Sequence, residues 1–131
     1  MKFNGHFDLI DAHSSHHMLL LRNTTILENA ETINIDILFE SVKYIDIPTF
    51  FNGLTIEEGA DDDKLFLKSK YFDGTVFDYC KIFVLESQGL KFYVIAVRCV
   101  ITENSLGVGV TSIGFFKSYA KPTNTKSIKV W

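Results

Sequence analysis

The sequence contains few of the residues on which several protein classes depend. Two cysteines, Cys80 and Cys99, are too few for a disulfide framework or a four-thiolate zinc site. The longest apolar runs, such as residues 92–97, are far shorter than the roughly 18 residues that a membrane-spanning helix needs. The first residues contain no sustained apolar stretch of the kind found in secretory signals. We therefore expect a cytoplasmic protein with reduced thiols and no membrane association.

Arginine is equally scarce, since Arg22 and Arg98 are the only two in 131 residues. The formal net charge is −3, and it is unevenly distributed. All sixteen acids lie in residues 1–116 beside nine Lys and Arg, a balance of −7, whereas residues 117–131 carry four lysines and no acid. Nucleic-acid-binding domains usually present a basic stripe. This acidic chain is therefore not expected to bind nucleic acid, apart from the basic tail considered below.

Aromatic and β-branched residues are plentiful, and they alternate with polar residues as they do in β-strands. The chain has twelve Phe and five Tyr. In residues 33–39, Ile and Phe share one face while Asn34 and Asp36 share the other, which predicts a strand with one face in the core and one in water. After a turn near residues 40–41, residues 42–48 are predicted to form the partner strand, which ends at Pro48 because proline cannot donate to a sheet ladder.

Residues 80–101 contain the clearest predicted hairpin, with a two-residue turn at Gln88–Gly89. The register that this turn sets pairs opposite charges beside the turn and apolar residues further in: Glu86 with Lys91, Leu85 with Phe92, Val84 with Tyr93, Phe83 with Val94 and Ile82 with Ile95. Both faces are apolar, so these two strands are expected to be central and covered on both sides. Cys80 and Cys99 fall on the same face in this register, where we expect buried, unreactive thiols.

The remaining predicted elements are short. Further strands are expected at about residues 3–10, 16–22, 65–70 and 107–116, with a loop at residues 12–15 between the first two. One short helix is predicted within residues 54–66, with an Asp of the 61–63 run as its N-cap. The last ten or so residues are expected to fray. The chain is thus predicted to be one all-β domain over residues 1–131, mainly antiparallel: a β-sandwich or a partly open β-barrel of seven or eight strands with at most one short helix.

Three of the four histidines lie within residues 13–17, and His6 and Asp8 lie shortly before them. Imidazoles and carboxylates bind metals, but adjacent strand residues point to opposite faces, so His16 and His17 cannot share one ion on a regular strand. The known H-x-H and H-E-x-x-H metal patterns are absent. We favour loop histidines near a sheet edge. The alternative is a metal-dependent or small-ligand β-barrel enzyme, with the ligand set His6, Asp8, His13 and one of His16 or His17, of which we take His16.

The densest run of charge is acidic and lies at residues 57–63. Its spacing does not match an EF-hand calcium loop, which needs acids at alternating positions and a late Glu. The run is either a solvated connector or a patch that docks a basic protein, where charge raises the association rate and the specificity. The candidate binding residues are Glu57, Glu58, Asp61, Asp62 and Asp63.

Other chemistries have less support. No G-x-S-x-G elbow occurs, and the glycines of residues 107–114 lack the lysine and the following helix of a phosphate loop. The C-terminal tail interleaves four lysines with Phe115, Phe116, Tyr119 and Trp131, a combination that can stack single-stranded nucleic acid. Single-strand binding by this tail is therefore a second alternative function. No cofactor is expected.

The stretches "HSSHHMLLLR" and "INIDILFESVKYIDIPTF", within residues 12–51, resemble a pattern in small uncharacterised bacterial β-rich proteins. In that pattern a His-Ser stretch precedes Leu-Leu-Leu-Arg, and a strand pair ends in Pro-Thr. The resemblance implies no catalytic residue, and by analogy of fold and size it implies an immunity-like or accessory role. We therefore expect a non-enzymatic module that binds another protein, with a basic protein as the partner that best fits the acidic patch.

Overall fold

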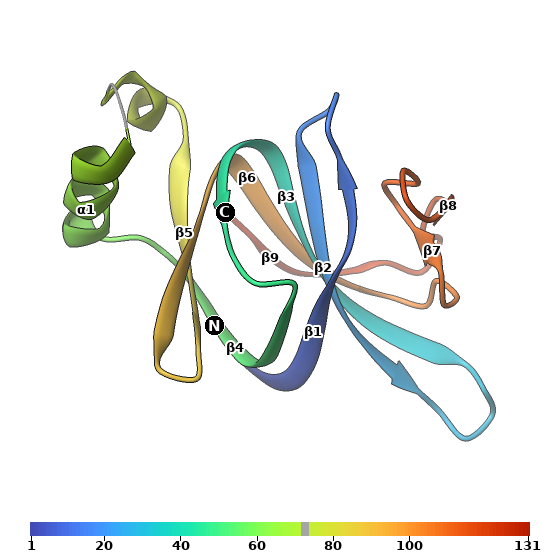
Figure 1. The fold of residues 1–131 in the computed structure, drawn as a ribbon. Helices are drawn as coiled ribbons and strands as arrows, with labels where there is room; N and C mark the ends of the chain where they lie inside the picture. The colour runs from blue at the N-terminus through green and yellow to red at the C-terminus, as the bar shows by residue number, and fades with distance from the viewer. Residues whose placement is uncertain (72–73) are drawn as a thin grey trace.

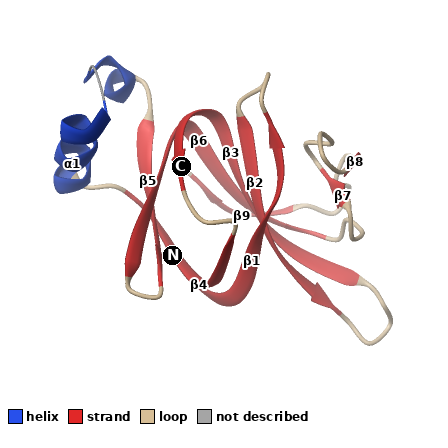
Figure 2. Cartoon of the chain, viewed as in Figure 1, coloured by secondary structure: helices blue, strands red, loops and turns tan. Residues whose placement is uncertain are grey.

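Long alternating segments pair into one sheet that closes on itself in the computed structural model, which describes residues 1–71 and 74–131 (Figure 1). The strands are β1 (Lys2–His13), β2 (Met18–Ile26), β3 (Thr32–Asp46), β4 (Phe50–Glu58), β5 (Lys81–Ser87), β6 (Leu90–Asn104), β7 (Val110–Thr111), β8 (Ser118–Tyr119) and β9 (Lys126–Val130). The described residues also form one α-helix, α1 (Asp61–Tyr71), and a 3-10 helix, η1 (Gly74–Asp78), between β4 and β5 (Figure 2).

The strand order explains the closure of the sheet. Six strands follow one another in the order β3-β2-β1-β4-β5-β6, and β3 pairs again with β6 to complete a barrel. One edge of β6 carries β5 along its first half and β9 along its second half, while β3 follows the other edge. The prediction of a mainly antiparallel all-β fold with one short helix is therefore confirmed. Of the architectures that the sequence left open, the chain adopts a barrel, and the barrel is closed.

Large apolar side chains fill the barrel interior because each strand turns alternate residues inward. Phe39 and Phe83 meet edge to face with ring centroids 5.5 Å apart, and Phe51 meets Phe92 in the same way at 5.8 Å. Each fully buried side chain of this size contributes about 1.5–3 kcal/mol to stability. The buried members of this interior cluster are Phe7, Leu19, Leu21, Ile37, Phe39, Val42, Phe51, Leu54, Ile56, Phe83, Leu85, Val94, Ala96, Cys99 and Ile101.

The β5–β6 hairpin has the register that the sequence predicts, from Ile82 opposite Ile95 to Glu86 opposite Lys91. Gln88 and Gly89 both take positive φ, 54° and 76°, as the two-residue turn requires. The hairpin is covered on both faces. Its inward side chains join the barrel interior, and a second cluster covers its outer face: Leu67 of α1 with Cys80, Ile82, Val84, Tyr93 and Ile95.

β3 continues through the turn that was predicted near residues 40–41, so the predicted hairpin of residues 33–39 with 42–48 is wrong. Ser41 takes a left-handed φ of 53°, which bends the strand without reversing it. The first part of β3 pairs with both β2 and β6, whereas Val42 and the residues after it pair only with β6. β3 therefore leaves β2 at Ser41.

The bend also changes which side chains face inward on β6. Val97 and Arg98 are both exposed, so the alternation shifts by one residue at this point. Cys99 consequently lies in the barrel interior, whereas Cys80 lies in the outer cluster beside α1. The prediction that the two thiols share a face is wrong. Both are buried, and burial raises the pKa of each thiol, as expected for unreactive cysteines.

Residues 65–70, predicted as a strand, belong to α1. Only Leu67 of this apolar run is fully buried, against the outer face of β5 and β6, while Leu65 and Phe66 stay exposed. The predicted short helix is present, but its N-cap is Ala60, whose carbonyl accepts from the Lys64 N–H. Asp63 instead reaches back to accept a hydrogen bond from the Ala60 N–H at 2.9 Å, as the third residue of a capping box does.

Three further boundaries differ from the sequence prediction. The β1–β2 turn occupies residues 14–17, because β1 extends as far as His13. Within residues 107–116 only β7 is a strand, and it pairs in parallel with the two-residue β8. The C-terminal residues, expected to fray, include a paired strand: β9 pairs with β6, and the Trp131 N–H donates to the carbonyl of Cys99 at 2.9 Å. That anchor and the contact of Trp131 with Phe83 hold the end of the chain on the barrel.

The outer face of β2 and β3 is buried rather than solvated, because residues 105–120, which we call the strap, lie over it. Asp36 accepts two hydrogen bonds from Arg22, Nε to Oδ1 at 2.6 Å and Nη2 to Oδ2 at 2.8 Å. Arg22 Nη1 donates to the carbonyl of Val110 in the strap at 2.7 Å. Asn104 donates to Asp36, and Asn34 donates to Asn104. The side chains that the alternation assigned to water thus form a buried polar network.

We expect Arg22→Ala to lower the free energy of unfolding by about 3–5 kcal/mol, because it leaves the buried carboxylate of Asp36 without its cation. Arg98→Ala is the matched control, since it breaks an exposed pair with Glu40 at 3.5 Å and should cost about 1 kcal/mol or less. Urea denaturation measures both. Equal costs for the two variants would contradict a structural role for the buried pair.

Candidate functional site

The clustered histidines lie at the tip of the β1–β2 hairpin. His17 closes the turn with a left-handed φ of 52°. The rings of His13 and His16 lie 4.4 Å apart, and Nδ1 of His13 accepts from the His16 backbone N–H at 3.2 Å. When the His13 ring is neutral, this hydrogen bond places its proton on Nε2.

His6 lies further down β1 in different surroundings. Its Nδ1 lies 2.6 Å from Oδ1 of Asn52, and its Nε2 lies 2.9 Å from Oδ1 of Asp8. Both ring nitrogens thus face acceptors, and the hydrogen bonds to Asn52 and to Asp8 raise the pKa of His6 above its ordinary 6.5. In this arrangement both ring nitrogens are engaged with Asn52 and Asp8 rather than with a metal.

The proposed metal set is therefore divided into two pairs, His6 with Asp8 and His13 with His16. Within residues 1–71 and 74–131, no three His, Cys, Asp or Glu side chains converge in a way that could hold a metal ion. The geometry of the described residues gives no support to the metal-dependent alternative.

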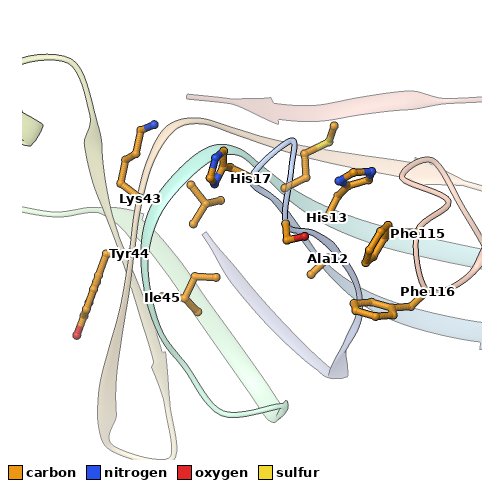
Figure 3. Close-up of a pocket in the computed structure, with 11 residues that line it drawn as sticks. Ala12, His13, His17, Lys43, Tyr44, Ile45, Phe115 and Phe116 are labelled. Atoms are coloured by element: carbon orange, nitrogen blue, oxygen red, sulfur yellow. The ribbon is translucent and has the colours of Figure 1, made fainter.

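A pocket of about 430 Å³ opens beside the hairpin tip, at the place where β3 leaves β2 (Figure 3). We call it the hairpin-tip pocket; its lining residues come from the hairpin, from β3 beyond Ser41 and from the strap. The hairpin contributes Ala12, His13, Ser14, His17 and Met18, β3 contributes Val42, Lys43, Tyr44 and Ile45, and the strap contributes Phe115 and Phe116. Most of the lining is apolar, and the volume falls in the range of small-molecule sites.

Asp11 holds the strap at this pocket. Its fully buried carboxylate accepts hydrogen bonds from the Thr111 hydroxyl and from the Phe115 and Phe116 backbone N–H groups, at 2.5, 3.3 and 2.8 Å. Burial alone would raise the pKa of Asp11, but the hydrogen bonds from Thr111, from these two amides and from the Ala12 N–H outweigh it and lower the pKa below the ordinary 3.8. Asp11 thus fixes two walls of the pocket relative to each other.

The acidic residues that the sequence singled out gather around a second, polar cleft of about 290 Å³. This acidic cleft lies between the end of β4, the start of α1 and the β5–β6 hairpin, and its lining residues are Thr55, Glu57, Glu58, Ala60, Asp63, Val84, Glu86 and Lys91. Asp61 and Asp62 lie on the exposed first turn of α1 beside it. The structure therefore brings four of its carboxylates together from three elements.

Asp63 differs from the other acids in this group. Its Oδ2 caps α1, and its Oδ1 accepts a hydrogen bond from the Tyr93 hydroxyl at 3.3 Å. Glu57 and Glu58 remain largely exposed. Asp63 is therefore a structural residue, and Glu57 and Glu58 are the ones that a partner can reach.

Several site residues escaped the sequence reasoning. Glu86 was predicted to lie opposite Lys91 in a hairpin, as it does, but it was not considered as part of a charged site. Lys43 and Ile45 were assigned to a hairpin that does not form. Asp11 gave no local signal, since Asp8 of the same strand is exposed and the distant strap is what buries Asp11.

Two of the aromatic residues of the C-terminal tail pack against other parts of the domain. Phe115 contacts the His13 ring at 4.5 Å, and Trp131 contacts Phe83 and lies under Lys129. Phe116 and Tyr119 remain exposed. Two of the four rings proposed for single-strand stacking are thus engaged by the domain itself.

We expect Asp11→Asn to lower the free energy of unfolding by about 1–3 kcal/mol, because it weakens the acceptor for the strap hydrogen bonds. The folded-state pKa of Asp11 is lowered, so the contribution of its carboxylate is present at neutral pH and is lost as the pH falls below about 4. The stability difference between wild type and Asp11→Asn should therefore shrink in acid.

Chemical denaturation at neutral and acid pH measures this difference, with Asp8→Asn, an exposed carboxylate of the same strand, as the control. Limited proteolysis should cut the strap faster in Asp11→Asn than in Asp8→Asn. Equal cleavage of the two variants would show that Asp11 does not hold the strap.

Comparisons with known proteins leave the function to be argued from this geometry. No family model, no curated protein and no solved structure matches the chain. In the described part of the chain, no helix is long and apolar enough to cross a membrane.

Proposed function

We propose that this protein is a non-enzymatic binding module of the cytoplasm, that its partner is a basic protein, and that the acidic cleft is the docking surface. The observation that carries the proposal is the convergence of Glu57, Glu58, Asp63 and Glu86 on one concave surface. The resemblance of residues 12–51 to small bacterial β-rich proteins favours an immunity-like or accessory role for such a module.

The charge balance at the cleft favours a cationic partner. Lys91 is the only basic residue in the lining, 3.9 Å from Asp63 and 3.8 Å from Glu86, and the N-terminal amine lies 3.6 Å from Glu57. The exposed Asp61 and Asp62 add to the negative field. A surface whose net charge is negative attracts a partner of the opposite sign and raises the association rate.

The cleft is also rigid, which lowers the entropic cost of binding. β4 and β5 are barrel strands paired with each other from Thr55 to Glu58. α1 is fixed by the Asp63 cap and by Leu67, which is fully buried against the barrel. A partner therefore meets a preformed surface.

The reactive side chains of the chain favour binding over catalysis. His6 is hydrogen-bonded to Asn52 and Asp8, which raise its pKa, and burial raises the pKa of both thiols, so Cys80 and Cys99 are poor nucleophiles.

We expect the double variant Glu57→Gln, Glu58→Gln to slow association with a labelled polylysine peptide about threefold or more at low ionic strength, because it removes two charges from the cleft. The matched control is Glu28→Gln, Glu31→Gln, which removes two exposed charges near the β2–β3 turn, far from α1 in Figure 1. Asp63 is left intact because its loss would disturb α1.

Stopped-flow fluorescence gives the two association rates. The proposal expects a clear effect of the cleft variant, a small effect of the control, and convergence of all rates at high salt. Equal slowing by the two variants would mean that only net charge matters, and would reject the cleft as the docking surface.

A further inference from the structure

We propose that the hairpin-tip pocket binds a small amphipathic carboxylate, with its apolar body between β3 and the strap and its carboxylate at Lys43 and His17. The pocket shares no lining residue with the acidic cleft, so this inference is independent of the proposed protein partner.

The first support is the apolar surface that the pocket leaves open to water. Ile45 and Phe115 are each 47 % exposed and Phe116 is 70 % exposed, and all three line this pocket. In Figure 3, Phe115 and Phe116 project from the strap on one side of the pocket, and Ile45 lies on the other. The buried Val42, three residues before Ile45 on β3, is part of the same lining. An apolar ligand of modest size would remove this surface from water.

The second support is the sign of the charge. The described residues of the lining include His13, His17 and Lys43, and none of them carries a carboxylate. Among the described residues, neither Lys43 nor His17 forms an ion pair. Both side chains lie along the same end of the pocket in Figure 3. These groups complement an anion.

Neighbouring acids do not compete for this position, since each is engaged elsewhere. The carboxylate of Asp11 is occupied by the strap, and Glu40 faces Arg98. Asp46 lies 3.4 Å from the Tyr44 hydroxyl, which points away from His17 and Phe115 in Figure 3. The cationic end of the pocket is therefore left for a ligand.

The chemistry of the donors indicates the class of anion. Bidentate recognition of a phosphate uses arginine, and backbone recognition uses a helix N-terminus; the described residues of the lining provide neither. One ammonium group and imidazole donors suit a single negative charge. With the apolar remainder of the lining, this set fits a carboxylate that carries an aliphatic or aromatic body.

The pocket is preformed, because each of its three walls is fixed by contacts of the barrel. The Val42 N–H donates to the His17 carbonyl at 2.8 Å and joins β3 to the hairpin tip. The bend at Ser41 directs the following residues of β3 away from β2 and opens the space between them. Asp11 holds the third wall through the backbone amides of Phe115 and Phe116.

The test compares three probes that share one apolar chain: octanoate, octanamide and octylammonium. Binding is followed by protein-observed NMR and quantified by titration calorimetry. We expect octanoate to bind at least about tenfold more tightly than octylammonium, with shifts centred on Val42, Ile45 and Phe115. Equal affinity for octanoate and octylammonium, or shifts elsewhere, would overturn the proposal.

Lys43→Gln should weaken octanoate about tenfold and leave octanamide nearly unchanged, because it removes only the charge. Lys126→Gln, an exposed lysine of β9, is the matched control and should change neither affinity.

Phe115→Ala should weaken both probes, and a retained NMR spectrum for the rest of the barrel verifies its fold. An unchanged octanoate affinity in Lys43→Gln would reject the anion site. Concentration-dependent shifts at the pocket without any probe would identify a second copy of the chain as its occupant and would also reject it.

Discussion

The pairing of β3 with β6 along most of their length is the constraint on which the rest of the molecule depends. It closes the barrel, and it continues through a bend in both strands, where Ser41 adopts a left-handed conformation and where Val97 and Arg98 face outward together. The same bend separates β3 from β2 and opens the hairpin-tip pocket. On the opposite side of the barrel, closure through β5 and β6 forms the platform on which α1 rests and the acidic cleft is built. Both candidate binding surfaces therefore follow from one feature of the sheet.

The local parts of this fold could be predicted from the sequence, and the parts that depend on distant segments could not. The β5–β6 register followed from a two-residue turn at Gln88–Gly89 and from the residues on either side of it. The interpretation of residues 40–41 as a turn was wrong. Apolar and polar residues alternate before and after these positions, and the pattern is the same whether the chain bends there or reverses its direction. Residues 65–70 were misassigned because a short apolar run fits a strand as well as a helix. Asn34 and Asp36 were assigned to water because nothing in their own strand shows that the strap covers them.

The same distinction between local sequence and distant contacts applies to the candidate sites. The acidic residues were recognised because they are contiguous in sequence, and the fold added Glu86 and gave Asp63 a capping role. The histidines attracted attention for the same reason, yet β1 keeps His6 apart from His13, and each has its own partners. The hairpin-tip pocket joins Met18, Lys43 and Phe115, which are separated by long stretches of chain. No local pattern could have identified it.

The most direct measurement is a set of backbone nuclear Overhauser effects that locates the neighbours of β3 on both sides of Ser41. The closed barrel predicts contacts from Ile37 to Ile101 and from Ile45 to Val94, with β6 as the common partner. Contacts between residues 33–39 and residues 42–48, as in a hairpin, would contradict the closed barrel. The hairpin-tip pocket would then not exist in the form described here.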